Sequence, residues 1–302
     1  MRATAEAVVE RRASAQTGRG RSPAAAAWRR LVASPAARAG LLLVVAFVAL
    51  AALTPAMHSY EARTDADLTA RLKAPTTSHP FGTDSLGRDI MVRVLHATRV
   101  SLGLAISAVA VAAVIGAGLG FLAGYVRGRV DLVVMFCMDI VLAFPATLLA
   151  IAIVAMIGPG LRNSLFAISL VSIPAYARLS RASVLALREQ EFVLAAQSLG
   201  CTGWRVLLSH VVPNSLPPLI VQTTLSIAFA ILEAAALGFL GLGAQPPTPE
   251  WGAMLADSYK YFTSGAWWVF CFPGAAIMLS VLGFNLLGDG LRDALDPRLG
   301  RD

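Results

Sequence analysis

Residues Glu191–Asn214 read EFVLAAQSLGCTGWRVLLSHVVPN, and this stretch decides the fold. It predicts two short helices. The first spans about 184–199 and ends at Gly200, because glycine commonly terminates a helix. The second starts after Thr202, whose hydroxyl suits an N-cap, and ends before Pro213. A compact helix pair of this kind is predicted to be a protruding element that binds another protein. Val193, Ala196 and Leu199 are predicted to form a small apolar face on it.

The composition around this stretch is that of a membrane protein. The chain of 302 residues is 57% hydrophobic and 14% charged, whereas a soluble domain carries about 25% charged residues. The net charge of +7 comes almost entirely from arginine. These arginines lie in short stretches between apolar runs, which is typical of topology signals. We therefore do not expect the protein to bind nucleic acid, and we expect membrane lipid to be its surroundings.

Six apolar runs are each close to the roughly 20 residues that cross a bilayer. The sequence therefore predicts an all-α polytopic protein with six transmembrane helices. A basic tail, residues 1–38, precedes the first run. That run is longer than the apolar part of a signal peptide, so it is predicted to be an uncleaved span. The six runs are 39–57, 101–125, 132–157, 163–180, 216–243 and 266–288.

The positions of the arginines predict the orientation. Arginine-rich segments stay on the cytoplasmic side, which places both termini, 1–38 and 289–302, and the predicted helix pair inside. The loop 58–100 then lies outside. Within it Leu86, Ile90 and Val94 repeat every four residues. This pattern indicates an amphipathic helix, either on the membrane surface or packed on another subunit.

Two features inside the spans point to packing and to a pathway. Gly116, Gly120 and Gly124 recur every four residues, with Gly128 following, and such spacing predicts close packing of another helix. Asp139 and Glu233 lie in apolar runs, where an acid costs roughly 2.5–3.5 kcal/mol. Both acids are candidate pathway-lining residues. The alternative is a structural hydrogen bond between helices.

The sequence offers no catalytic site, metal site or cofactor site. A phosphate-binding loop needs Gly-Lys-Ser or Gly-Lys-Thr, but Lys73 and Lys260, the two lysines of the chain, do not follow glycine. No HExxH helix is present, and the three cysteines form no CxxC pair. We therefore do not expect an enzyme, and the energy for transport has to come from a partner. An ion-coupled secondary transporter is the alternative from a different class, although no internal repeat supports it.

Separate sequence blocks resemble one family. The Ala195-Ala196 pair, followed by Gly200 and Pro213, is similar to the EAA loop of ABC importer permeases, with Leu194 where that loop usually has glutamate. The other blocks resemble permeases of the peptide/nickel importer family, and the resemblance is closest to the dipeptide permease C subunit. It covers roughly residues 40–300. These blocks are His79–Asp84, Gly87–Asp89, Arg99–Leu102, Ala236–Gly243, Gln245–Gly252 and Asn285–Pro297.

The resemblance implies a type I ABC importer permease fold in the bacterial cytoplasmic (inner) membrane. Residues 101–288 would form a five-helix core that includes a coupling loop at 184–215, and the first span would flank it. The implied partners are a homologous B-type permease, two ABC ATPase subunits and an extracytoplasmic peptide-binding protein. The implied substrates are dipeptides or short peptides, with oligopeptides, glutathione, haem and nickel complexes as alternatives. The implied ATPase-coupling residues are Glu191, Ala195, Ala196, Gly200, Arg205, His210 and Pro213.

Overall fold

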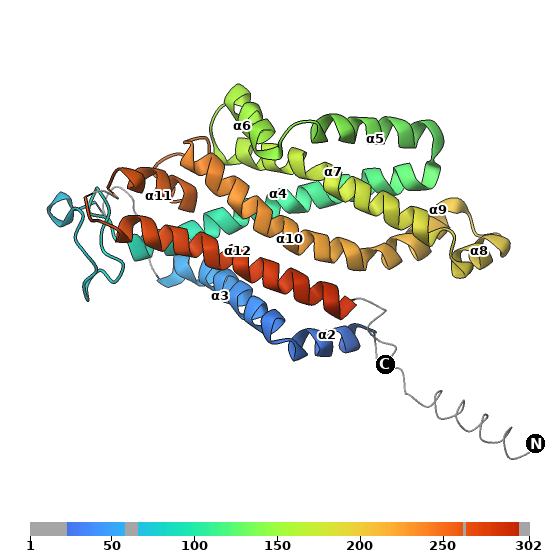
Figure 1. Ribbon diagram of the computed structural model, residues 1–302, viewed down its shortest axis with the longest axis horizontal. Coiled ribbons are helices and arrows are strands. Elements are labelled where there is room, and N and C mark those ends of the chain that lie inside the picture. Colours follow the sequence, from blue (N-terminus) through green and yellow to red (C-terminus); the bar gives the residue numbers. More distant parts are fainter. Residues whose placement is uncertain (1–22, 58–65, 262–263, 296–302) are drawn as a thin grey trace, which may run out of the picture.

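The computed structural model describes residues 23–57, 66–261 and 264–295, and within these ranges the fold is all-α, as predicted. Four long helices, α4, α7, α10 and α12, run along the molecule (Figure 1). Helices α8 and α9 lie at one end, and α11 lies at the other. The helices are α2 Pro23–Ala33, α3 Pro35–Met57, α4 Ile90–Val126, α5 Gly128–Leu142, α6 Ala146–Ile157, α7 Leu161–Leu187, α8 Glu191–Ser198, α9 Gly203–Val206, α10 Val212–Phe239, α11 Trp251–Ser258 and α12 Trp268–Leu295.

All six predicted apolar runs are helical, but fewer of them qualify as spans by length and composition. Among the described residues, α3, α4, the continuous helix Gly203–Phe239 and α12 are long and apolar enough to cross a membrane. The pair α5–α6 makes a fifth span if it is counted as one. Helix α7 has 27 residues, but its arginines and serines lower its mean hydropathy. Because α7 packs closely along α4, contacts within the protein compensate for its polar side chains.

The third predicted span is broken near its middle. The two helices α5 and α6 meet at an angle of 87°. Pro145 causes the break, because proline lacks an N–H group and disfavours a helical conformation at the residue before it. The chain therefore leaves α5 at Ala143 and starts α6 directly after Pro145.

The prediction that residues 1–38 form an unstructured tail is wrong for the part that the structure describes. Helix α2 occupies Pro23–Ala33, and α3 begins four residues earlier than predicted. Leu31, Ala37 and Ala294 form a small buried cluster that joins α2 and α3 to the end of α12. Packing against α12 therefore buries the apolar side of a short amphipathic helix, so the segment 23–33 has an apolar period after all. Residues 1–22 lie outside the described part, as do 58–65 and 296–302.

The predicted amphipathic segment around Leu86–Val94 is not a separate helix. Helix α4 starts at Ile90, after Asp89, whose carboxylate accepts a hydrogen bond from the Val92 N–H at 3.1 Å. Ile90 and Val94 are buried inside this chain. Arg93 is buried too, because it forms an ion pair with the buried Asp84. This segment is therefore an extension of α4 and part of the protein interior.

A buried glutamate fixes the loop between α10 and α12 to α4. The Glu250 side chain is 1% exposed and accepts hydrogen bonds from the N–H groups of Gly252 and Ala253, both at 2.9 Å. The Ser101 hydroxyl of α4 donates to the same carboxylate at 3.1 Å. Burial raises the pKa of Glu250, although these three donors oppose the shift. Glu250 thus caps α11 and holds it against the first third of α4.

Candidate functional site

The predicted helix pair protrudes from one end of the molecule. Residues 184–187 of its predicted first helix belong to α7, and α8 then begins at Glu191 after a turn. Helix α8 ends as predicted. Gly200 has a φ of +82°, and the N–H groups of Cys201 and Gly200 donate to Ala196 and Gln197 at 3.1 and 2.9 Å. This is the Schellman arrangement, in which glycine adopts the left-handed conformation without a steric penalty.

The second helix of the pair does not end before Pro213, so this prediction is wrong. Helix α9 continues through a π-helical turn, Leu207–Val211, directly into α10. In this wider turn the Val212 N–H donates to the Leu207 carbonyl, five residues earlier. The extra residue lets the helix continue past Pro213, which has no N–H to donate. Thr202 precedes α9 in an extended conformation, but its side chain makes no capping hydrogen bond.

A small core holds the pair to the long helices. Gly203 lies so close to α4 that a Cβ atom there would be 2.6 Å from the Tyr125 hydroxyl. Leu199, which the sequence grouped with Val193 and Ala196 on one apolar face, does not belong to this core, because its side chain is 86% exposed. The pair is therefore attached directly to the ends of α4, α7 and α10. The buried residues of the core are Val184, Val193, Ala196, Val206, Leu207 and Val211.

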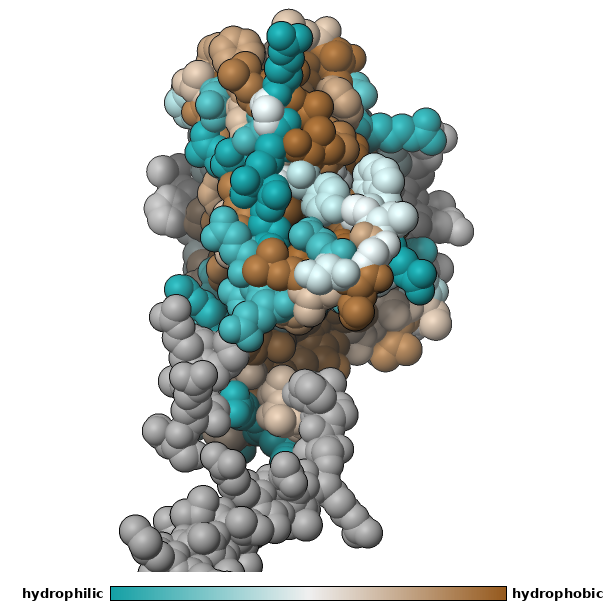
Figure 2. All heavy atoms as spheres, turned by 90° about the vertical axis from the view of Figure 1, so that its right-hand side faces the viewer, coloured by the Kyte–Doolittle hydropathy of each residue, from teal (hydrophilic) through white to brown (hydrophobic). Residues whose placement is uncertain are grey.

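The outer surface of the pair carries large exposed apolar side chains. Figure 2 looks onto this end and shows hydrophobic side chains between polar ones. Such a cluster on a protruding element is typical of a protein–protein contact. We call these five side chains the apolar patch: Phe192, Leu194, Leu199, Trp204 and Leu208.

The structure brings all seven predicted coupling residues to this end, but they differ in exposure. Ala196 is buried and His210 is half-buried. The exposed ones are Glu191, Ala195, Gly200, Arg205 and Pro213. Trp204 and Leu208 were missed in the sequence. Their signal was two large apolar residues four positions apart within a short helix that was predicted to be cytoplasmic.

The three glycines of α4 face α7 at very short range. A Cβ atom at Gly116 would lie 2.5 Å from the Ile173 carbonyl oxygen, and one at Gly120 would lie closer still to the Ala177 carbonyl oxygen. At Gly124 the nearest atom would be 2.9 Å away, whereas Gly128 has open space around it. The backbones of α4 and α7 therefore approach closely, as in other small-residue helix contacts.

The two candidate pathway acids lie in different environments. Asp139 of α5 forms an ion pair with Arg178 of α7 at 2.6 Å, and the side chains are 59% and 54% exposed. Glu233 of α10 is 4% exposed, and its carboxylate accepts a hydrogen bond from the Thr147 hydroxyl of α6 at 2.6 Å. Its second oxygen is buried without a hydrogen-bond partner among the described residues. In this structure Asp139 is accessible and Glu233 is enclosed.

A pocket with three polar residues in an otherwise apolar lining lies near the exposed ion pair. Its volume is about 300 Å³, and it opens between the start of α6, α7 and α10. Its polar side chains are Ser172, Gln222 and Ser226. Ser172 and Ala175, which also lines the pocket, share a face of α7 with Arg178, because residues three apart on a helix lie side by side. We call this surface the polar track; it consists of Ser172, Ala175, Arg178, Gln222 and Ser226. These residues were not predicted to line a path, although Gln222 and Ser226 interrupt an apolar run at helical spacing.

Comparison with solved structures identifies the class of fold. Two solved structures described as inward-facing conformations of the MetNI methionine ABC transporter superpose with TM-scores of 0.57 and 0.53. Both share 18% sequence identity with this chain and cover 68% of it and 98% of the solved chain. The protein therefore has the type I ABC importer permease fold, as predicted.

Sequence comparison then defines the family. Residues 116–301 match the profile of the binding-protein-dependent transport system inner membrane component, and residues 22–75 match the N-terminal TM domain of oligopeptide transport permease C. The chain belongs to this family of inner-membrane permease components, and it is a multi-pass membrane protein. The predicted relation to peptide permeases of the C type is thereby confirmed.

Three relatives illustrate the family. The dipeptide transport system permease protein DppC of Alkalihalophilus pseudofirmus is 48% identical, over 92% of this chain and 91% of its own length. The di/tripeptide transport system permease protein DppC of Pseudomonas aeruginosa is 47% identical, over 92% and 93%. The glutathione transport system permease protein GsiD of Pectobacterium atrosepticum is 44% identical, over 92% of each chain.

Proposed function

We propose that this protein is a permease subunit of an ATP-driven importer that carries dipeptides and other short peptides across the bacterial cytoplasmic membrane. The similarity to permeases named for dipeptides and di/tripeptides, over nine-tenths of the chain, supports this substrate class. Glutathione is the second candidate, because a permease named for it is nearly as similar. Oligopeptides, haem and nickel complexes remain as further alternatives within the same role.

The observation that carries the proposal is the apolar patch on α8 and α9. Side chains such as Leu199 and Trp204 are too exposed to stabilise this chain, and a partner surface would bury them. The proposed partner is an ABC ATPase subunit, one of two in the complex, which hydrolyses the ATP. A homologous B-type permease would complete the pathway, and an extracytoplasmic binding protein would deliver the peptide. In this arrangement the α8 end and both termini are cytoplasmic, in agreement with the arginine distribution.

The connections of the helix pair support a mechanism. Helix α8 follows α7 after a three-residue turn, and α9 is continuous with α10. Helices α7 and α10 also carry the polar track. An ATPase that displaces the helix pair would therefore displace both walls of this track together. Such a rigid-body movement would open the track alternately to the two sides of the membrane.

We propose that the polar track is this chain's share of the translocation path. An exposed ion pair such as Asp139–Arg178 is costly against lipid, so a water-filled path is its favourable environment. Ser172, Gln222 and Ser226 extend this polar surface along α7 and α10. Glu233 would reach the path only after α6 moves away, since Thr147 of α6 now covers it.

Ala175→Trp tests the path directly. Ala175 is exposed and lines the pocket of the polar track, so an indole there should fill the pocket without disturbing the interior. We expect the variant to assemble normally and to lose most of its peptide uptake, measured with labelled dipeptide in whole cells. The matched control is Ala110→Trp, at an exposed position on α4 outside this pocket. Equal uptake by the two variants would contradict the path assignment.

The substrate class is tested in a strain that lacks this gene. We expect uptake of labelled dipeptides and tripeptides to be lost and to return with the intact gene, while longer peptides enter normally. The purified chain should bring down a nucleotide-hydrolysing subunit, because it offers the apolar patch but no ATP site. If an ATPase subunit co-purifies but the deletion strain takes up peptides normally, the permease role stands and the proposed peptide substrate is wrong. Uptake driven by an ion gradient without an ATPase would refute the role itself.

A further inference from the structure

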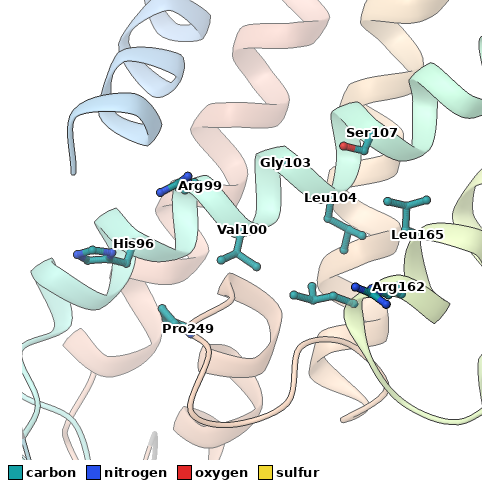
Figure 3. A pocket seen from close by; sticks show the side chains of 10 residues that line it. His96, Arg99, Val100, Gly103, Leu104, Ser107, Arg162, Leu165 and Pro249 are labelled. Atoms are coloured by element: carbon teal, nitrogen blue, oxygen red, sulfur yellow. The ribbon is translucent and has the colours of Figure 1, made fainter. Parts of the chain in front are cut away.

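A second pocket lies at the end of the molecule opposite α8. Its volume is about 550 Å³, and it is formed by the first third of α4, the start of α7 and the loop before α11. Figure 3 shows His96 and Arg99 towards the start of α4, and Arg162 farther along, near Leu104. Pro249 covers the pocket from the loop that the neighbouring Glu250 fixes to α4. The polar track and the helix pair do not use this pocket.

The two arginines of the pocket are not neutralised by this chain. Arg99 and Arg162 are exposed, and neither forms an ion pair within the described residues. The contrast is with Arg88, Arg93, Arg178 and Arg181, each of which pairs with an aspartate. Two guanidinium groups at one pocket favour an anion, and their planar donor geometry suits phosphate or carboxylate.

The rest of the pocket is apolar. The side chains of Val100 and Leu104 lie between the two arginines, and Leu165 lies beside Arg162 (Figure 3). Beyond the pocket the surface continues with the exposed Ile106 on α4 and Phe166 on α7. The pocket is therefore amphipathic, basic at its rim and apolar within. A small soluble anion would gain nothing from these apolar side chains, whereas an anion attached to a hydrocarbon chain would.

The position of the pocket fits the headgroup region of a bilayer. Helix α7 has 27 residues and is thus about 40 Å long, whereas the hydrocarbon core is about 30 Å thick. Arg162 is the second residue of α7 and therefore lies close to the boundary between lipid and water. The exposed Phe166, one turn farther along α7, then lies on the hydrocarbon side of that boundary.

We propose that this pocket binds one phospholipid molecule. Its phosphate is held by Arg162, the rest of its headgroup extends along the rim towards Arg99, and one acyl chain lies over Leu104 and Leu165. The bound lipid joins α4 to the start of α7 at the end where α11 is docked. This site is independent of the transported substrate, and it requires only that the bundle spans a membrane.

Native mass spectrometry tests the site. The full-length chain, with the subunits that accompany it, is purified in mild detergent, and the retained phospholipids are counted. We expect the double variant Arg99→Gln/Arg162→Gln to retain one phospholipid fewer than the unaltered protein. Gly103→Phe should do the same without a change of charge, because Gly103 lines the pocket and a side chain there meets open space. Arg129→Gln, which removes an exposed cation at the opposite end, should retain the full number.

A second measurement separates lipid from other anions. Vesicles of phosphatidylglycerol should raise the Tm of the unaltered protein more than that of the double variant. Soluble glycerol phosphate, which has the headgroup without the chains, should raise neither. Equal lipid retention in all variants would overturn the proposal, and so would protection by glycerol phosphate alone. Because lipid counting does not depend on uptake, failure here would leave the proposed transport function standing.

Discussion

Replacing Leu199 and Trp204 together by aspartate should release the ATPase from this permease. Both side chains are strongly exposed, at 86% and 60%, so the chain itself should fold normally. Loss of one central tryptophan from an interface typically costs at least about 2 kcal/mol, which weakens binding roughly 30-fold. Two buried charges should cost more. We expect peptide uptake to be lost and the ATPase to be absent after affinity purification of the permease.

The matched control for this experiment is Leu68→Asp. Leu68 is also an exposed leucine, but it lies in the segment before α4, at the opposite end of the molecule. This variant should keep both the ATPase and the uptake. Gly200→Glu is a weaker test, because the φ of +82° at Gly200 strains any side chain regardless of docking. A double variant that still carries the ATPase and transports at the normal rate would refute the docking assignment.

Gly120→Val should prevent α4 and α7 from packing and abolish the folded permease. A Cβ atom there would overlap both the Ser180 hydroxyl and the Ala177 carbonyl oxygen. A backbone atom cannot move aside as the end of a flexible side chain can. Overpacking typically costs about 1–3 kcal/mol, and this contact should reach or exceed the upper value. The measurements are the amount of permease in membranes and its Tm after purification.

Gly118→Val provides the control on the same helix. Gly118 is two residues away, and a Cβ atom added there would have no neighbouring atom within 4 Å. Both variants carry the same loss of glycine and the same gain of a β-branched side chain in α4. Normal membrane levels for Gly118→Val with strongly reduced levels for Gly120→Val are expected. Similar levels for the two would show that the close approach of α4 and α7 is not needed for folding.

Local signals in the sequence predicted the parts of the fold that local physics determines. The apolar runs predicted the helices, because lipid requires long apolar segments. Gly200 predicted the end of α8, because only its backbone suits the turn there. Leu199 is separated from Val193 and Ala196 because α8 ends beside it, so its side chain stays exposed. Helix α2 was missed because its short amphipathic pattern lies among many alanines and arginines, and its burial partner in α12 is distant in sequence.

The remaining differences concern contacts and turns that no periodic pattern in the sequence shows. Arg93 could be buried only because Asp84 neutralises it, and the pattern around Ile90 does not reveal this pair. Pro213 was predicted to follow a helix end because the π-turn before it leaves no sign in the sequence. The polar track was missed because it exists only where α7 and α10 meet. Sequence thus predicted the helix pair as a unit, while its attachment and the path beside it required the tertiary structure.

The absence of a joint between α9 and α10 has a mechanical consequence. The continuous helix Gly203–Phe239 has 37 residues and is therefore about 55 Å long. It can act as a lever: a tilt of roughly 5° about its Gly203 end would shift the Phe239 end by about 5 Å. That end touches the outer loop at Gly238, where an added Cβ atom would overlap the Glu250 carboxylate. Under the proposed docking, a movement that the ATPase imposes on the helix pair would therefore be transmitted by α10 directly to the loop that holds Glu250.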